Sequence, residues 1–131
     1  MIKLVTADNL DTRDFTIENN KVRVKSNETI KNYILDNVAY ISFQGNENDR
    51  KRLSVKNGLG ILHLDFTPNF NTIIKKKLFE LPPDAPVPLT TLEHQFKNGG
   101  SAWIEAGQRE VWGHWLERGE RVIFDLVGFF E

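Results

Sequence analysis

The sequence lacks cysteine altogether, which excludes several kinds of stabilisation and chemistry. With 0 cysteines among 131 residues, disulfides, thiol catalysis, iron–sulfur clusters and cysteine-ligated zinc are excluded. An excess of charge of one sign is also missing, because 17 Lys and Arg residues stand against 18 Asp and Glu residues, for a net charge of -1. This balance gives no general attraction to nucleic acid or anionic lipid, so we expect no nucleic-acid partner.

Long apolar runs are absent as well. Uninterrupted apolar stretches, such as Val38 to Tyr40 and Val122 to Phe124, fall far short of the roughly 20 residues that span a bilayer. Met1 to Val5 does not open a signal peptide, because Thr6 and Asp8 interrupt the apolar segment at once. We therefore expect no membrane insertion and no export by that route.

The residues that are present indicate one globular domain of β class. Hydrophobic residues make up 40% of the chain and charged residues 27%, which is near the average for folded proteins. Gly, Asn, Asp or Pro interrupts the apolar stretches about every eight to twelve residues, a spacing typical of antiparallel all-β domains. The sequence therefore predicts an all-β fold, an antiparallel and jelly-roll-like β-sandwich.

The first 36 residues have a different pattern from the rest. Apolar and polar residues alternate on both sides of Asn19-Asn20, which predicts a hairpin from Asp14 to Lys25. After it, Ile30, Tyr33 and Ile34 have helical spacing behind the capping residues Ser26 and Asn27, which favours one short helix near residues 28-36. The alternative for this stretch is a strand or an irregular link. We expect residues 1-36 to form a clamp or docking arm and residues 37-131 to form the sandwich domain.

From Asn37 onward, short alternating segments predict a series of strands. Turn formers such as Asn57-Gly58, Asn98-Gly99-Gly100 and Gly119 separate them. Asn57-Gly58 favours a type I′ turn, which predicts a hairpin over Lys51 to Phe66, and Gly119 is expected to close another. The predicted strands are Val38 to Phe43, Lys51 to Lys56, Ile61 to Phe66, Thr72 to Glu80, Thr90 to Phe96, Ser101 to Glu105, Glu110 to Leu116 and Arg121 to Phe130.

Two segments have a composition that ordinary strands do not share. Leu81 to Leu89 contains four of the five prolines, and because each proline removes an N–H donor, it predicts an extended connector between the sheets. The alternative is a polyproline-type ligand for another protein. The last strand is apolar on both faces, with Phe124 on one and Ile123 and Val127 on the other. Such a strand needs cover on both faces, either from another subunit or from the N-terminal segment.

The polar residues do not form a recognisable catalytic or metal-binding pattern. The segment Gly99 to Trp103 fails as a nucleophile elbow, because Trp103 stands where that motif requires glycine. His63 and Asp65 share one strand face, which we interpret as a solvated face and not as a metal pair. We therefore predict no catalytic residue, no metal site, no cofactor and no enzymatic activity.

The tryptophans are the most informative residues of the second half. All 3 lie between Trp103 and Trp115. On a regular strand, Trp112 and Trp115 point to opposite faces, so one indole is expected at the surface or at an interface. Indole faces stack on the C–H side of sugar rings, while core or subunit packing is the alternative use. The candidate ligand-binding residues are Trp103, Glu105, Gln108, Trp112, His114 and Trp115.

The C-terminal stretch also resembles a known family. The motifs that carry the resemblance are Leu81-Pro82-Pro83-Asp84, the run from Asn98 to Ile104, and the terminal Val127-Gly128-Phe129-Phe130. They are similar to the C-terminal β domains of tailed-phage tail-tip proteins, namely baseplate, tail-fibre and receptor-binding proteins of phages of Gram-positive bacteria. The corresponding pieces here are Leu78 to Pro82, Asn98 to Gly107 and Arg109 to Phe130.

The resemblance implies a structural role in a virion. It implies a homo-oligomer, with a trimer favoured, that contacts other tail or baseplate proteins and attaches to host cell-wall saccharide. The localisation implied is the virion tail tip, after synthesis in the bacterial host cytoplasm. Alternatives are a stand-alone carbohydrate-binding or protein-binding sandwich, or a virion assembly protein without receptor binding. The chain has no collagen-like repeat and no heptad neck, so we expect a small accessory tail protein or an excised domain.

Overall fold

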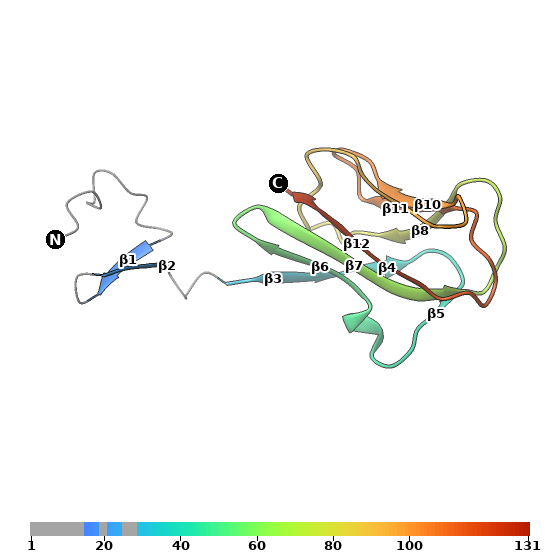
Figure 1. Cartoon of the computed structure of the whole chain (residues 1–131), viewed down its shortest axis with the longest axis horizontal. Helices are drawn as coiled ribbons and strands as arrows, with labels where there is room; N and C mark the ends of the chain where they lie inside the picture. Colours follow the sequence, from blue (N-terminus) through green and yellow to red (C-terminus); the bar gives the residue numbers. More distant parts are fainter. Residues whose placement is uncertain (1–14, 19–20, 25–28) are drawn as a thin grey trace. The chain divides into compact units, whose positions relative to one another are not determined.

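The computed structural model describes residues 15–18, 21–24 and 29–131, the first two ranges by their backbone alone. The chain divides into two units, Met1–Ile30 and Lys31–Glu131. In the first, β1 (Phe15–Glu18) and β2 (Lys21–Val24) pair antiparallel, as Figure 1 shows. This pairing confirms the hairpin predicted over Asp14 to Lys25, whose Asn19-Asn20 turn lies outside the described residues.

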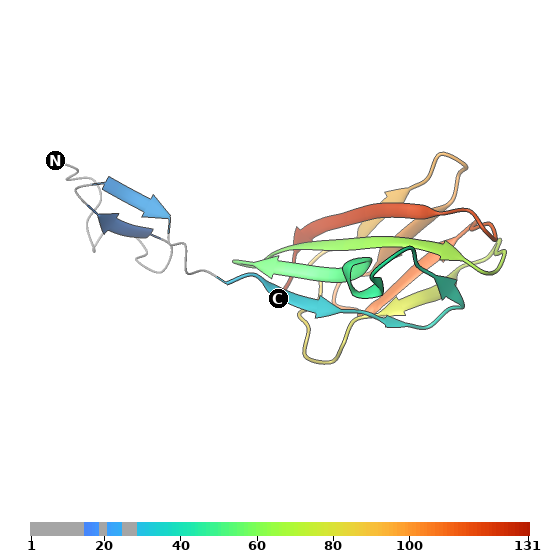
Figure 2. The same cartoon turned by 90° about the horizontal axis from the view of Figure 1, so that it is seen from below.

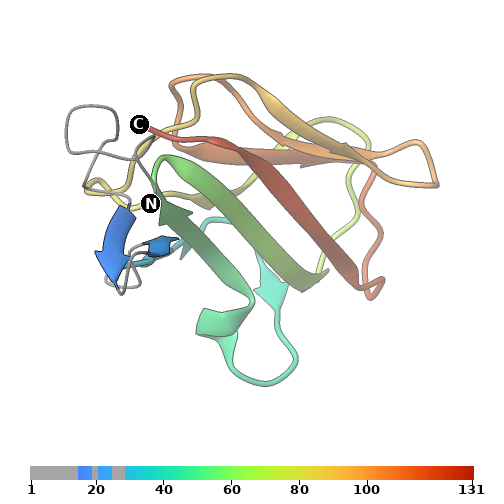
Figure 3. The ribbon, with the colours of Figure 1, turned by 60° about the vertical axis from the view of Figure 1, so that its left-hand side comes forward.

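The second unit consists of two antiparallel sheets packed face to face, which confirms the predicted all-β sandwich (Figure 1). The first sheet has the order β12-β7-β6-β3, with β5 beside β7, and the second has the order β4-β8-β11-β10-β9. Figure 2 shows the long β7 and β12 in the near layer, and Figure 3 shows the green and red strands of the first sheet below the orange strands of the second. The strands are β3 (Lys31–Ile34), β4 (Asp36–Asn37), β5 (Ile41–Ser42), β6 (Lys51–Lys56), β7 (Leu59–Pro68), β8 (Lys76–Glu80), β9 (Leu92–Gln95), β10 (Ser101–Ile104), β11 (Glu110–His114) and β12 (Val122–Phe129).

The β6–β7 hairpin forms the centre of the first sheet. Asn57 has φ 53° and Gly58 has φ 79°, and a type I′ turn needs positive φ at both of these positions. The turn sets the register that places Leu53 opposite Leu62, with both side chains fully buried. The hairpin predicted from Asn57-Gly58 is therefore confirmed, and β7 continues to Pro68.

Aromatic rings connect the two sheets through the core. The ring of Phe66 on β7 lies 5.2 Å from that of Phe79 on β8 and 6.3 Å from that of Phe124 on β12, both edge to face. Phe124 in turn stacks on His94 of β9 at 5.4 Å between ring centres. Rings at these distances and tilts add packing energy beyond the area they bury, so this row fixes the position of β9 against β12.

The short helix expected near residues 28-36 is wrong. Lys31–Ile34 forms β3 and pairs with β6, with Tyr33 opposite Leu53, and Asp36–Asn37 forms β4 in the other sheet. The helical spacing covered too few residues to outweigh the edge of β6, which offered unpaired backbone groups. The unit boundary accordingly falls after Ile30 and not after Asp36.

Some connections also differ from the prediction. Leu81 to Leu89 joins β8 to β9, which lie at two places in the same sheet, so it is a connector but does not run between sheets. It pairs with the end of β12 through two Val87–Glu131 backbone hydrogen bonds. The turn at Gly119 joins β11 to β12, which lie in different sheets, so it closes no hairpin.

The predicted strand Thr72 to Glu80 begins only at Lys76, and within Val38 to Phe43 only Ile41–Ser42 is a strand. Glu47–Asp49 forms one turn of 3-10 helix, η1. Among the described residues there is no helix with the length and apolar character of a membrane span.

We predict that Gly60→Ala destabilises the sandwich by about 1–3 kcal/mol, because overpacking a filled core costs that much. A Cβ at Gly60 would lie 2.8 Å from Cε1 of Phe130, a ring that is only 3% exposed and cannot move away. The measurement is the free energy of unfolding in urea, with the exposed Thr90→Ala as a control expected to change it by less than about 0.5 kcal/mol. Equal stability of the two variants would contradict the packing described.

Candidate functional site

Three of the predicted site residues lie together on the outer face of the second sheet. Trp103 on β10 stands opposite Trp112 on β11, and His114 follows two residues later on the same face. The rings of Trp103 and His114 meet edge to face at 5.6 Å, and all three side chains are half-buried. We call this surface, around Trp103, Trp112 and His114, the tryptophan face.

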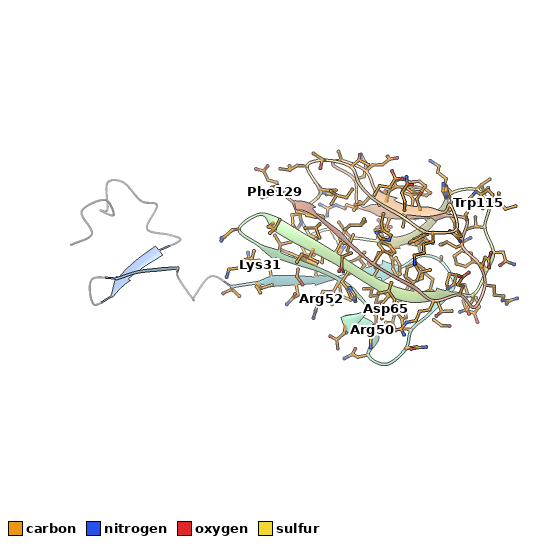
Figure 4. All side chains as sticks on the ribbon, viewed as in Figure 1. Lys31, Arg50, Arg52, Asp65, Trp115 and Phe129 are labelled. Carbon is orange, nitrogen blue, oxygen red and sulfur yellow. The ribbon has the colours of Figure 1, made fainter. Side chains whose placement is uncertain are left out.

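Trp115 lies elsewhere, at one end of the sandwich (Figure 4). The regular strand predicted to Leu116 ends at His114, and Trp115 has φ 58°. Left-handed backbone is an outlier for a bulky aromatic residue and persists only where neighbours hold it. The indole is 52% exposed. Trp115 is thus the exposed tryptophan that the sequence predicted. It reaches the surface because the backbone changes direction after His114, and not because side chains alternate along a strand.

The β9–β10 turn holds Trp115 in this conformation. The side-chain amide of Asn98 donates to the carbonyl oxygen of Trp115 at 3.2 Å and accepts from the backbone N–H of Gly100 at 2.9 Å. Gly100 packs so closely that a Cβ there would lie 2.6 Å from the carbonyl oxygen of His114. The Asn98-Gly99-Gly100 sequence therefore supports Trp115 as well as forming a turn.

Trp115 borders a cavity of about 550 Å³, which we call the Trp115 pocket. It lies between the end of β9, the loop from Trp115 to Arg121 and the start of β12. Phe96 and Val122 contribute apolar lining, and the Phe96 ring packs on buried Phe124 at 5.6 Å. A pocket with an apolar floor and a polar rim is the usual form of a small-ligand site. The polar and charged residues around the cavity are His94, Gln95, Lys97, Asn98, Glu117, Glu120 and Arg121.

A buried carboxylate anchors the loop that carries this rim. Asp65 is 3% exposed and accepts two hydrogen bonds from Arg121, at 2.8 and 2.7 Å, and one from Arg50 at 3.0 Å. The hydrogen bonds from Arg121 lower the pKa of Asp65 below its ordinary value, and the charge of Arg50 lowers it further. Asp65 therefore stays ionised and keeps the end of the loop fixed beside β7. Figure 4 labels Asp65 together with Arg50, one of its two partners.

Asp65 does not have the role that the sequence suggested. It is not on a solvated strand face with His63, because Arg50 and Arg121 cover it. His63 pairs with Asp125 of β12 instead, at 2.7 Å. No sequence pattern links Asp65 with two arginines that are 15 and 56 residues away.

A second, shallower cavity of about 600 Å³ lies on the tryptophan face. Its walls include Trp103 and His114, together with the exposed carboxylates Glu93 and Glu105. Predicted Gln108 is in the β10–β11 turn, outside the lining of both cavities. The Nδ1 atom of His114 is buried without a hydrogen-bond partner among the described residues. An atom left unpaired in this way costs about 1–3 kcal/mol.

The outer face of β7 and β12 is apolar and exposed, and we call it the β7–β12 face. Pairs across the two strands share a row, with Phe129 beside Leu59, Val127 beside Ile61 and Asp125 beside His63. The four apolar members are between 44% and 60% exposed. The two-sided apolar pattern predicted for the last strand is therefore present, with one side in the core and the other uncovered within the described chain.

The described residues contain no group of three or more His, Asp or Glu side chains placed to hold a metal ion. No protein-family model, curated protein or solved structure matches the chain.

We predict that Asp65→Asn lowers the free energy of unfolding at pH 7 by about 2–4 kcal/mol, because it leaves two arginines facing a neutral group. Since folding lowers the pKa of Asp65, its contribution is complete above the unfolded value near 3.8 and is lost as the pH falls through the folded value. The difference between the wild type and the variant should therefore shrink below about pH 4. Urea unfolding at pH 7 and pH 3 measures it.

The control for that comparison is Asp49→Asn, which removes an exposed ion pair with Arg52 and should cost less than about 1 kcal/mol. A difference between wild type and Asp65→Asn that stays constant from pH 7 to pH 3 would show that the Asp65 charge does not hold the loop.

Proposed function

We propose that the protein is a non-enzymatic binding module that recognises saccharide at the Trp115 pocket. The observation that carries this proposal is the exposed indole of Trp115, held with φ 58° above a cavity of about 550 Å³. Selection for stability alone would not keep an aromatic residue in left-handed backbone at the surface, because that conformation costs about 1–3 kcal/mol. The strain is consistent with a residue kept for ligand contact.

The chemistry around Trp115 suits a sugar ring. The flat indole provides an apolar platform for ring C–H groups, and Gln95, Glu117 and Glu120 provide acceptors and a donor for hydroxyl groups. Lys97 adds a positively charged hydrogen-bond donor beside the same cavity. A single open site of this kind binds weakly, on the order of millimolar, and repeated copies raise the avidity by about 10²–10⁴.

A role at a phage tail tip would use such weak, repeated sites. One of the C-terminal motifs that resemble tail-tip proteins, the run from Asn98 to Ile104, borders the pocket, since Asn98 and Gly100 support Trp115 directly. We therefore propose host cell-wall saccharide as the ligand and the virion tail tip as the place of action, with other tail or baseplate proteins as partners. The runner-up role is a virion assembly protein without receptor binding.

The second part of the proposal is self-assembly through the β7–β12 face, with a second copy of the chain as the occupant. A two-fold axis parallel to the strands and midway between β7 and β12 would place each residue of β12 opposite its own row partner on β7 of the other copy. Phe129 would then face Leu59, Val127 would face Ile61 and Asp125 would face His63. In these three rows apolar residues meet apolar ones and a carboxylate meets an imidazole, as a self-complementary interface requires.

We predict that Trp115→Ala weakens binding to purified wall polysaccharide of Gram-positive bacteria at least tenfold, about 1.4 kcal/mol. Tyr40→Ala is the control, because it removes an exposed aromatic side chain that lines neither cavity, and its binding should stay within twofold of wild type. Isothermal titration measures the affinities. Unchanged binding by Trp115→Ala would remove the pocket from the function, and new reducing ends after incubation with the polysaccharide would show an enzyme.

We predict a dimer in solution, with a mass about twice the 15.1 kDa of the chain, and dissociation by Val127→Lys. The introduced lysine would face Ile61 of the other copy without a partner charge, and burial of an unpaired charge is costly. Ile74→Lys is the control, since Ile74 is 79% exposed and lies off this face. Light scattering gives the mass. A trimer would contradict the two-fold pairing and would agree with the oligomer that the tail-tip resemblance implies.

A further inference from the structure

The cavity on the tryptophan face differs in charge from the Trp115 pocket. The ionisable residues in its lining are Glu93, Glu105 and His114, and no lysine or arginine is among the lining residues. The carboxylate of Glu105 makes no hydrogen bond or ion pair with a described residue, while that of Glu93 accepts one hydrogen bond from Gln95 at 3.0 Å. The cavity therefore combines two exposed carboxylates with the indole of Trp103 and has no lysine or arginine in its lining.

Trp103 is a neighbour of both carboxylates. Glu93 on β9 is its partner across the β9–β10 pair, and Glu105 follows two residues after it and lines the same cavity. An indole face attracts a cation within about 6 Å of the ring centre, and nearby carboxylates add to that attraction. The arrangement suits a positively charged group that lies against Trp103.

The neighbouring tryptophan shows the same interaction within the chain. The Nζ atom of Lys75 lies over the ring of Trp112, 4.8 Å from its centre. Trp112 is the partner of Trp103 across the β10–β11 pair, so the two indoles share one row of the sheet. Among the described residues no cation lies over Trp103. One indole of the row thus has a cation supplied by the chain, and the other has carboxylates but no cation.

We propose that the cavity beside Trp103 is a second binding site, separate from the Trp115 pocket, and that it binds an alkylammonium group. Trp103 contacts the methyl or methylene groups around the nitrogen, and Glu93 and Glu105 neutralise the charge. A lone cation–π contact at an exposed site contributes about 0.5–1 kcal/mol, so the site is weak unless the ammonium is one of many on a polymer.

The test follows the three indole N–H signals in a proton–nitrogen correlation spectrum, after single Trp→Phe variants have assigned each signal. Choline is the quaternary probe and Nα-acetyl-lysine amide is the primary one. The uncharged carbon isostere of choline and matched sodium chloride are the ligand controls. We expect saturable shifts of the Trp103 signal with choline, with lysine amide or with both, while the Trp115 signal stays unchanged.

Variants then locate the charge that binds the probe. Glu93→Gln combined with Glu105→Gln should weaken binding at least about fivefold without unfolding the protein, because both side chains are exposed. The matched control is Glu117→Gln combined with Glu120→Gln at the Trp115 pocket, which should leave the affinity unchanged. Unaltered binding by the first double variant, equal binding of the isostere, or no shift with either probe would overturn the proposal.

The same spectra separate this site from the proposed saccharide function. Saccharide is expected to move the Trp115 signal and ammonium the Trp103 signal. Failure of one therefore leaves the other intact, and a choline response at Trp115 alone would contradict the inference made for Trp103.

Discussion

The carboxylate of Asp65 joins three segments that are distant in the chain. It sits on β7 and binds Arg50, which precedes β6, and Arg121, which precedes β12. A carboxylate that is 3% exposed is costly to bury unless its charge is matched, and two guanidinium groups match it. Once formed, this cluster fixes the end of the loop that begins at Trp115. The loop carries the chain from one sheet to the other, so the same contact positions both the sheets and the pocket.

The hydrogen bonds that hold this loop explain how the pocket at the end of the sandwich keeps its form. Besides Asp65, it is held by backbone or side-chain hydrogen bonds to Pro68, Asn71, Thr72 and Asn98. Below it, the row His94–Phe124–Phe66–Phe79 continues into the core. The pocket therefore rests on packed rings, and its rim is fixed before any ligand arrives. A preformed site loses less ordering entropy on binding, which matters most where the contacts are few.

The sequence predicted the class of the fold and most strands, since alternation and turn residues are local signals. Asn57-Gly58 defined its hairpin because a type I′ turn depends on those two residues alone. Lys31–Ile34 became a strand because the free edge of β6 was available for pairing, and no local sequence pattern shows that edge. For the site, clustering of the tryptophans was visible, and Trp115 was among the candidates. Glu117, Glu120 and Lys97 were missed because no local pattern marks them as lining one cavity with Trp115. Asp65 was misread because both its arginines are distant in the chain, one just before β6 and the other just before β12.

The three surfaces occupy different parts of the molecule, and this separation limits what each can do alone. Figure 4 places Trp115 at the end of the sandwich opposite Phe129, which belongs to the β7–β12 face. Pairing through that face would consequently leave the Trp115 pockets of both copies open, and the tryptophan face lies on the other sheet, away from the contact. Weak sites gain avidity only if assembly presents several of them at once in a fixed arrangement. Burying apolar residues at one face while exposing ligand sites at others satisfies that condition, so assembly and ligand binding on this fold do not compete for the same surface.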